Sequence, residues 1–341
     1  MNKSTSVFVS GLLLGILLAT TIFAGLRHFQ QNNTSAERAR VVLKLGHSLE
    51  VGHPVHQAID LMRERLETFS GGEMTIDIYP GGVLGSETQN IEQIQNGSLS
   101  MTKTSAAVIE NFVPEMAVFG LPYVFRDEDH FWQVLDSEIG ERLLKEGESK
   151  FIRGLCYYDS GSRNFYGKSP IRTPEDLDGK KIRVMNSKTA IDMVNAIGAA
   201  PTPIAYGELY SALAQGIVDG AENNFPTFTS TKHYEICKHF TLDGHTRVPD
   251  VLLIGTKTWN SLQPRQQQWL QQAVEESAVA QRELWSAATQ KAREEAEAEG
   301  VTVYEVDIQP FADKVQAMHG EVEDSRVKSI LAEIKGMGSD G

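Results

Sequence analysis

Two arginines near the middle of the chain are the residues best suited to bind a ligand. Arg163 lies in the segment YYDSGSRNFYG, and Arg183 lies in GKKIRVMN between Ile182 and Val184. A guanidinium holds a carboxylate through two parallel hydrogen bonds, which lysine does not reproduce. These residues therefore predict a site for a carboxylate-bearing molecule. The alternative is structural, with Arg183 on the polar face of an edge strand and Arg163 in a solvated loop.

Other candidates follow the predicted strands, because ligands of crossover sheets collect beyond the carboxyl ends of the strands. The polar residues at these positions are His47, Ser48, Glu87, Asn186 and Asn223. Two have a simpler interpretation, since Asn223 could form a turn and Glu87 suits the first turn of a helix. His47, His53 and His56 have no acidic partner at metal-ligand spacing and are typical of solvated or capping histidines. We therefore predict neither a metal site nor a cofactor.

The elements that must position these residues alternate between strands and helices. Residues 41–49 (VVLKLGHSL) and 74–80 (MTIDIYP) alternate as strands do. Between them, residues 54–72 have apolar positions at helical spacing and end in two glycines. Residues 86–97 predict a helix capped by its first serine and ended by its last glycine, and a further strand is expected at 181–185. This order predicts crossover units and a largely parallel sheet.

One helical segment is longer than a single lobe needs. Residues 264–299 contain neither Gly nor Pro after the first position, and Ala, Glu, Gln and Arg dominate. They predict a single helix of about ten turns. It could pack along two lobes as a spine or form a coiled-coil arm. The absence of a sustained Leu or Ile heptad favours the spine.

Length and composition limit the class of protein. A chain of 341 residues is long enough for two lobes, and 41% hydrophobic with 23% charged residues exclude disorder and a multi-span membrane architecture. The net charge of −13 argues against nucleic acid binding. Local cations must therefore capture any anionic ligand. Cys156 and Cys237 lie in apolar patterns typical of buried thiols, although a mutual disulfide stays open.

The first 25 residues are typical of a targeting segment and not of the fold. Lys3 gives a positive start, and Val7 to Ala24 is an almost uninterrupted apolar run that ends in small residues. We predict a cleaved signal peptide for export. The run is nearly long enough to span a bilayer, so an uncleaved membrane anchor is the alternative.

From Val41 to about Lys335 the chain resembles a substrate-binding protein of the tripartite ATP-independent periplasmic (TRAP) transporters, of the dicarboxylate and sialic-acid receptor type. The resembling segments are LKLGHSL, IDIYPGGVLGSETQNIEQIQNGSLSM, PEMAVFGLPYVF, DLDGKKIRVMNS, GAAPTPIAYGELYSALAQGIVDGAENN and the long helix. The resemblance implies an α/β, two-domain periplasmic-binding-protein-like fold with a long helix spanning both domains. The expected domains are 41–161 with 249–288 and 162–248 with 289–335. It further implies a monomeric periplasmic receptor, not an enzyme, whose partners are a small organic acid and TRAP membrane permease subunits.

The resemblance also assigns residues to the site. By its motif Arg183 is the arginine that makes the defining salt bridge to the ligand carboxylate in that family. Arg163 matches a second arginine, and Asn223 matches a carboxylate-binding asparagine. Tyr206 occupies the place of an aromatic residue that packs over the ligand, and Asn186 falls in the pocket segment. The two domains are expected to close around the ligand by a hinge motion.

Contacts from the first domain decide which acid is bound. Where sialic-acid receptors have an asparagine after the first strand, this chain has Ser48, and their pocket glutamate is replaced at Ser105, which makes sialic acid doubtful. The remaining candidates mix donors and acceptors for hydroxyl groups; they are His47, Glu50, Glu87 and Ser105. A hexuronate such as glucuronate or galacturonate would satisfy them, whereas a C4-dicarboxylate would leave buried polar groups unpaired.

Other functions stay open from the sequence. A receptor for a C4-dicarboxylate, an aldonate or another organic acid would have the same overall features. A sugar-acid lyase or hydrolase needs an acid and base pair or an activated nucleophile. The sequence contains no Gly-x-Ser-x-Gly, His-Glu-x-x-His or phosphate-loop motif, although Glu87 and His47 could serve as acid and base.

Overall fold

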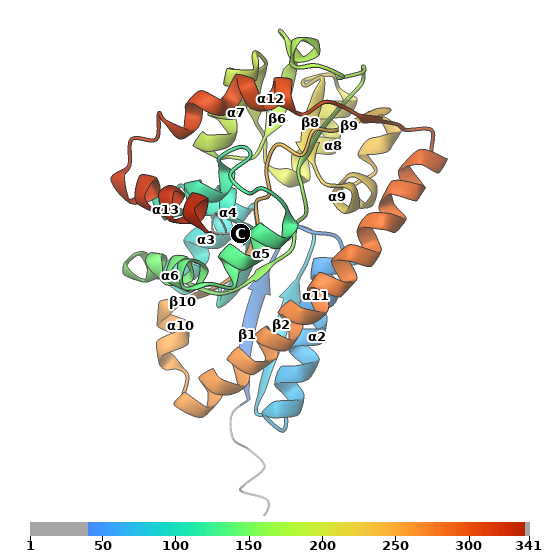
Figure 1. Ribbon diagram of the computed structural model, residues 1–341. Coiled ribbons are helices and arrows are strands. Elements are labelled where there is room, and N and C mark those ends of the chain that lie inside the picture. The colour runs from blue at the N-terminus through green and yellow to red at the C-terminus, as the bar shows by residue number, and fades with distance from the viewer. Residues whose placement is uncertain (1–39, 338–341) are drawn as a thin grey trace, which may run out of the picture. The chain divides into compact units, whose positions relative to one another are not determined.

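The computed structural model describes residues 40–337, and residues 42–337 belong to one compact unit (Figure 1). The predicted signal peptide or anchor, residues 1–25, lies outside the described residues. Within residues 40–337, none of the helices combines the length and the apolar character that crossing a bilayer requires.

The first of two sheets contains the strands of the first expected domain. Its strand order is β2-β1-β3-β10-β4. The bounds are β1 Val41–Gly46, β2 Met74–Tyr79, β3 Met101–Ser105, β4 Ile152–Tyr158 and β10 Asp250–Gly255. Strands β1 and β3 are parallel, whereas β10 runs antiparallel to both β3 and β4. Strands β1, β3 and β4 therefore share one direction, as a largely parallel sheet requires. Strand β10 departs from that prediction, because it returns from a distant part of the chain and enters the sheet antiparallel.

The second sheet is also mixed. Its order is β11-β9-β5-β8-β6-β7. The bounds are β5 Asn164–Gly167, β6 Lys181–Val184, β7 Ala200–Pro203, β8 Gly220–Asn223, β9 His239–Leu242 and β11 Thr302–Glu305. Strand β6 is parallel to β7 and β8, and β5 is antiparallel to β8 and β9. Arg183 thus lies on an interior strand, which contradicts the edge-strand alternative.

Helices cover both sheets. The α-helices are α2 Pro54–Phe69, α3 Glu87–Asn96, α4 Ala106–Ile109, α5 Glu128–Leu135, α6 Glu138–Lys145, α7 Lys188–Ile197, α8 Leu209–Ala214, α9 Phe225–Ser230, α10 Thr256–Ser261, α11 Pro264–Ala298, α12 Gln309–Val315 and α13 Ser325–Gly336. Short 3-10 helices are η1 Pro114–Gly120, η2 Glu146–Lys150, η3 Pro174–Leu177, η4 Tyr206–Glu208, η5 His233–Glu235 and η6 Gln316–His319.

The predicted limits of α3 are confirmed by its capping. Ser86 accepts a hydrogen bond from the backbone of Gln89, and the Gln89 side chain accepts one from the backbone of Ser86, which together form a capping box. Gly97 ends the helix in the left-handed conformation with a φ of 89°. The cap therefore fixes the position of Glu87, which is the first residue of the helix.

Separate apolar cores support the two sheets. The core beside the first sheet includes Ile91, Phe119, Phe131, Val251 and Leu253. It also takes in Val327, Ile330, Leu331 and Ile334 of α13. The second sheet has cores around Tyr166 and Phe240 and around Ile182 and Phe311. The domain boundaries stay a prediction, and we propose that α13 be counted with the first domain.

The long helix α11 joins the two halves, as predicted. It packs against α2 of the first half and α9 of the second (Figure 1), and it also contacts β4. Two buried polar residues attach it to the point where the chain leaves the first sheet. Ser277 Oγ lies 2.8 Å from the hydroxyl of Tyr158. Gln281 accepts a hydrogen bond from the backbone N–H of Asp159 at 2.7 Å and donates one to its carbonyl at 2.9 Å.

Replacing Gln281 with leucine is expected to lower the free energy of unfolding by about 2–6 kcal/mol. The leucine would leave both backbone groups of Asp159 buried without partners, and each such group costs about 1–3 kcal/mol. Urea unfolding measures the loss. Gln272→Leu, on an exposed position of the same helix, is the control and should change stability little. Equal small effects of the two variants would contradict the role of Gln281.

Both cysteines are free and buried, as their apolar surroundings predicted. Burial raises the pKa of the Cys237 thiol to about 12. Within residues 40–337 no group of three or more His, Cys, Asp or Glu side chains is placed to hold a metal ion.

Candidate functional site

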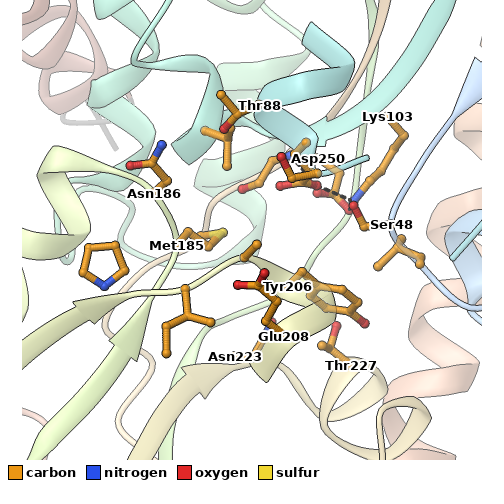
Figure 2. A pocket seen from close by; sticks show the side chains of 18 of the residues that line it. Ser48, Thr88, Lys103, Met185, Asn186, Tyr206, Glu208, Asn223, Thr227 and Asp250 are labelled. Carbon is orange, nitrogen blue, oxygen red and sulfur yellow. Dashed lines mark hydrogen bonds and ion pairs between the residues drawn. The ribbon is translucent and has the colours of Figure 1, made fainter. Parts of the chain in front are cut away.

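A cavity of about 500 Å³ lies where residues from both sheets meet. Its residues follow β1, begin α3, lie on β3 and β10, and follow β6, β7 and β8. Figure 2 shows Lys103 and Asp250 on one side and Asn223 and Thr227 on the other. The polar lining residues include Ser48, His53, Glu87, Lys103, Ser105, Ser160, Arg163, Arg183, Asn186, Tyr206, Glu208, Asn223, Thr227 and Asp250. Most predicted site residues are therefore brought together, although they lie far apart in the sequence.

Two predicted residues do not line the cavity. His47 is fully buried, its Nδ1 accepts the backbone N–H of Leu49 at 3.1 Å, and its Nε2 lies 3.0 Å from Nδ1 of His56. Glu50 is exposed in a turn, where its carbonyl accepts the backbone N–H of His53. The polar lining expected from these two residues comes instead from Lys103 and Asp250.

Arg183 presents a buried cationic group to the cavity. The side chain is 2% exposed, and its Nε donates to the carbonyl of Ile204 at 2.9 Å. Its Nη1 is buried without a hydrogen-bond partner among the described residues. Burial lowers the pKa of Arg183, and the nearby Glu222 carboxylate opposes that effect. A buried guanidinium N–H without an acceptor is costly, so this arrangement favours an anionic ligand.

Arg163 is committed mainly to a neighbouring carboxylate. Its Nε and Nη2 bind the two carboxylate oxygens of Glu222, the latter at 2.9 Å, and Nη2 also donates to the Glu222 carbonyl. Its Nη1 donates to Oδ1 of Asn223 at 3.1 Å. That oxygen also accepts the backbone N–H of Asn224. The Asn223 amide is thereby oriented with its NH₂ group available as a donor, and Arg163 acts on the site largely through Asn223.

Glu222 and Asp243 surround a buried histidine. His245 Nδ1 lies 2.6 Å from an oxygen of Asp243, and its Nε2 lies 3.5 Å from Glu222, which is an ion-pair distance and too long for a good hydrogen bond. Burial alone would lower the pKa of His245, but the two carboxylates raise it to about 9. Burial alone would raise the pKa of Glu222, but Arg163 and His245 lower it to about 2. Both groups are therefore charged at neutral pH.

The raised pKa of His245 predicts a loss of stability in alkali. The charged imidazolium contributes fully below its unfolded pKa of about 6.5, and the contribution is lost as the pH rises through about 9. We expect the free energy of unfolding to fall by about 3 kcal/mol across that window. Urea unfolding at several pH values measures the slope. His245→Gln should flatten it, whereas His239→Gln, whose histidine has a lowered pKa, should leave it unchanged. A wild-type slope in His245→Gln would contradict the assignment.

A second charged group forms the opposite wall. The ammonium of Lys103 lies 2.9 Å from Asp250 and 3.5 Å from Glu87, and all three side chains are largely buried. Burial alone would lower the pKa of Lys103, but Asp250 and Glu87 raise it. The backbone N–H of Ser105 also donates to Glu87, at 3.3 Å. The remaining carboxylate oxygen lone pairs are suited to accept hydrogen bonds from hydroxyl groups.

Sequence reasoning missed Lys103, Asp250 and Glu222. Each is a charged residue inside or beside a strand whose neighbours are buried: MTKTS, DVLLIG and GAEN. A buried charge requires a partner of opposite sign, so such positions could have been identified as candidates. The pairing of Lys103 with Asp250 could not be predicted, because β3 and β10 become neighbours only in the folded sheet.

The chain matches the model of bacterial extracellular solute-binding protein, family 7, over residues 45–325. It is similar to a TRAP periplasmic solute-binding protein from Xanthobacter autotrophicus Py2 with bound β-D-galacturonate, at 36% identity and a TM-score of 0.84 over 86% of this chain and 99% of that one. A protein from Pseudomonas putida F1 with bound D-glucuronate has 36% identity and a TM-score of 0.84 over 88% and 98%. One from Polaromonas sp. JS666 bound to D-erythronate has 29% identity and a TM-score of 0.85 over 88% and 100%.

Proposed function

Since the chain belongs to the bacterial extracellular solute-binding proteins of family 7, we propose that it is the receptor of a TRAP transporter for a hexuronate such as glucuronate or galacturonate. The observation that carries this proposal is the buried guanidinium of Arg183 at the cavity, whose Nη1 has no hydrogen-bond partner within residues 40–337. A ligand carboxylate would accept hydrogen bonds from Arg183 and from the amide of Asn223. Tyr206 lines the same cavity and would pack over the ligand.

The charge distribution favours one carboxylate and several hydroxyls over two carboxylates. On the side of the first sheet, the cation that lines the cavity among the described residues is Lys103, and two carboxyl groups already hold it. The second carboxylate of a C4-dicarboxylate would face Glu87 and Asp250 without a free cation. Sugar hydroxyls would instead donate to these oxygens. Glu87 and Ser105 therefore belong to the proposed hydroxyl-binding wall.

The ligands bound in similar receptors support a sugar acid as the ligand, but these acids differ in the length of their carbon chain. Galacturonate and glucuronate are bound in the receptors from Xanthobacter and Pseudomonas, and the shorter aldonate D-erythronate is bound in the one from Polaromonas. Arg183 and Asn223 would bind the carboxylate, and the wall formed by Glu87, Lys103 and Asp250 offers further hydrogen-bonding groups for hydroxyls. A six-carbon acid would use both walls of the cavity at once, which favours the hexuronate.

The mode of action proposed here is hinge closure without chemistry. The ligand binds between the two halves, and contacts to both walls stabilise the closed form. We further propose export to the periplasm through the N-terminal segment, cleavage near Ala24, a monomeric state and delivery to TRAP permease subunits. Mass spectrometry of the mature N terminus tests the cleavage, since an intact segment would mean a membrane anchor.

A thermal-shift screen of the purified protein tests the ligand class. A ligand that binds only the native state raises the melting temperature. We expect glucuronate or galacturonate to give the largest shift among a panel with erythronate, succinate and sialic acid. A larger shift with succinate would overturn the hexuronate assignment in favour of a dicarboxylate, and one with erythronate would favour an aldonate. NMR of the ligand after incubation should show it unchanged, whereas a new product would favour a lyase or hydrolase.

A further inference from the structure

His53 lines the cavity, and one of its ring nitrogens has no hydrogen-bond partner in the part of the chain that the structure describes. The residue is 2% exposed and is the N-cap of α2. Its Nε2 is buried and has no hydrogen-bond partner among the described residues. Its ring packs against Trp285 of α11, with centroids 5.8 Å apart. A buried polar atom of this kind needs a partner, and the neighbouring cavity is the place from which a ligand could supply one.

The hydrogen bonds of His53 determine which nitrogen carries the proton. Nδ1 accepts the backbone N–H of Val55 at 3.3 Å, so it is unprotonated. In the neutral ring the hydrogen must then sit on Nε2. Burial, followed by the charge of Lys103, lowers the pKa of His53 well below its usual value, so the ring is neutral. Nε2 is consequently a donor and cannot act as an acceptor.

Nearby side chains do not supply the missing acceptor. The carboxylates of Glu87 and Asp250 are turned to Lys103, and His47 is paired with His56. The capping bond to Val55 and the contact with Trp285 hold the imidazole in one orientation. The donor is therefore already in place before any ligand arrives, which lowers the entropy lost on binding.

We propose that the Nε2–H of His53 donates a hydrogen bond to an uncharged oxygen of the bound acid, a hydroxyl or a ring oxygen, and so helps to select the ligand. This deepens the proposed function and rests on it. The first-sheet side of the cavity would then offer one fixed donor beside the acceptors Glu87 and Asp250. One donor beside two acceptors suits neighbouring oxygens of a sugar, of which one accepts a hydrogen bond from the protein and the others donate hydrogen bonds to it.

Two substitutions at His53 separate its ligand contact from its capping role. Asparagine can keep the cap, because its side-chain oxygen can replace Nδ1, but it is too short to replace Nε2. Glutamine can place its NH₂ group near the position of Nε2 but caps a helix poorly. We expect His53→Asn to weaken hexuronate binding by about tenfold to a hundredfold, and to lower the melting temperature without ligand only through the lost packing against Trp285. His53→Gln should recover most of the affinity but lower that temperature through loss of the cap.

His130 provides the matched control outside the cavity. Its Nδ1 also accepts a backbone N–H, from Arg126, but its Nε2 already has a partner in the carbonyl of Ile334. His130→Asn should therefore reduce stability without changing the affinity. Monodeoxy hexuronates extend the test, since the one that lacks the accepting oxygen should lose affinity for the wild type and not for His53→Asn.

The outcomes distinguish this inference from the proposed function. If the wild type binds no hexuronate, the proposed function fails, and the same variants are measured with whichever acid of the panel binds. Wild-type affinity of His53→Asn for that acid would overturn the role of His53. Equal weakening by His53→Asn and His53→Gln would also overturn it, because it would show a requirement for the ring and not for the donor.

Discussion

Arg183→Lys is expected to weaken hexuronate binding by at least about 30-fold, and Arg183→Ala by about 100-fold or more. A lysine cannot both donate to the carbonyl of Ile204 and offer two parallel N–H groups to a carboxylate. Alanine would leave the ligand carboxylate in a buried site without its cation, and losing one partner of such a pair typically costs 2–5 kcal/mol or more. Isothermal titration calorimetry measures the affinities.

Arg65 provides the control for this change of charge. It lies on α2 with a side chain 48% exposed and pairs with Glu276 on the surface. Arg65→Ala changes the net charge as Arg183→Ala does, but it should leave the affinity near the wild-type value. Near-native affinity of Arg183→Lys would contradict the two-bond geometry at Arg183 and leave only a requirement for positive charge.

Glu222→Gln is expected to destabilise the protein by about 3–5 kcal/mol, because it removes the anion that separates buried cations. Arg163 binds the Glu222 carboxylate with two nitrogens, and His245 faces it from the other side. A glutamine would leave Arg163 charged and buried without its carboxylate. Chemical unfolding at neutral pH measures the loss. The affinity of the folded protein for an anionic ligand should persist, since Arg183 is retained.

A second buried glutamate serves as the comparison. Glu110 accepts hydrogen bonds from the backbone and the hydroxyl of Thr189, at 3.0 and 2.8 Å, and burial raises its pKa. Burial thus penalises the charged form of Glu110, and Glu110→Gln should cost less stability at neutral pH than Glu222→Gln. Similar losses in both variants would contradict the view that the charge of Glu222, and not its shape, is what the fold requires.

Local sequence patterns predicted much of the fold. The strand β1, the helix α3 with its Ser86 cap and Gly97 end, and the long α11 all followed from periodicity and capping. Helical spacing alone does not show the break between α5 and α6, which arises because Ser137 caps a new helix there. The antiparallel entry of β10 depends on contacts between distant segments, which no local pattern contains.

Some residues of the candidate site could likewise be predicted from local sequence, and others could not. Arg183 and Asn186 could be predicted because they lie at the end of a recognisable strand, where the sheet places its ligands. His47 lies at a similar position, yet its ring turns inward, because the backbone of Leu49 and the ring of His56 on α2 offer it partners. Lys103 was missed because its role depends on Asp250, which is distant in the sequence.

The most direct test compares two sugars that differ in a single group. D-glucuronate and D-glucose share their other hydroxyls, but glucuronate carries a carboxylate where glucose carries a hydroxymethyl group. Titration calorimetry of the mature wild-type protein should give clear binding of glucuronate, or of galacturonate against galactose, and no detectable binding of the neutral sugar. Comparable affinity for the acid and its neutral counterpart would contradict the claim that Arg183 pairs with a ligand carboxylate.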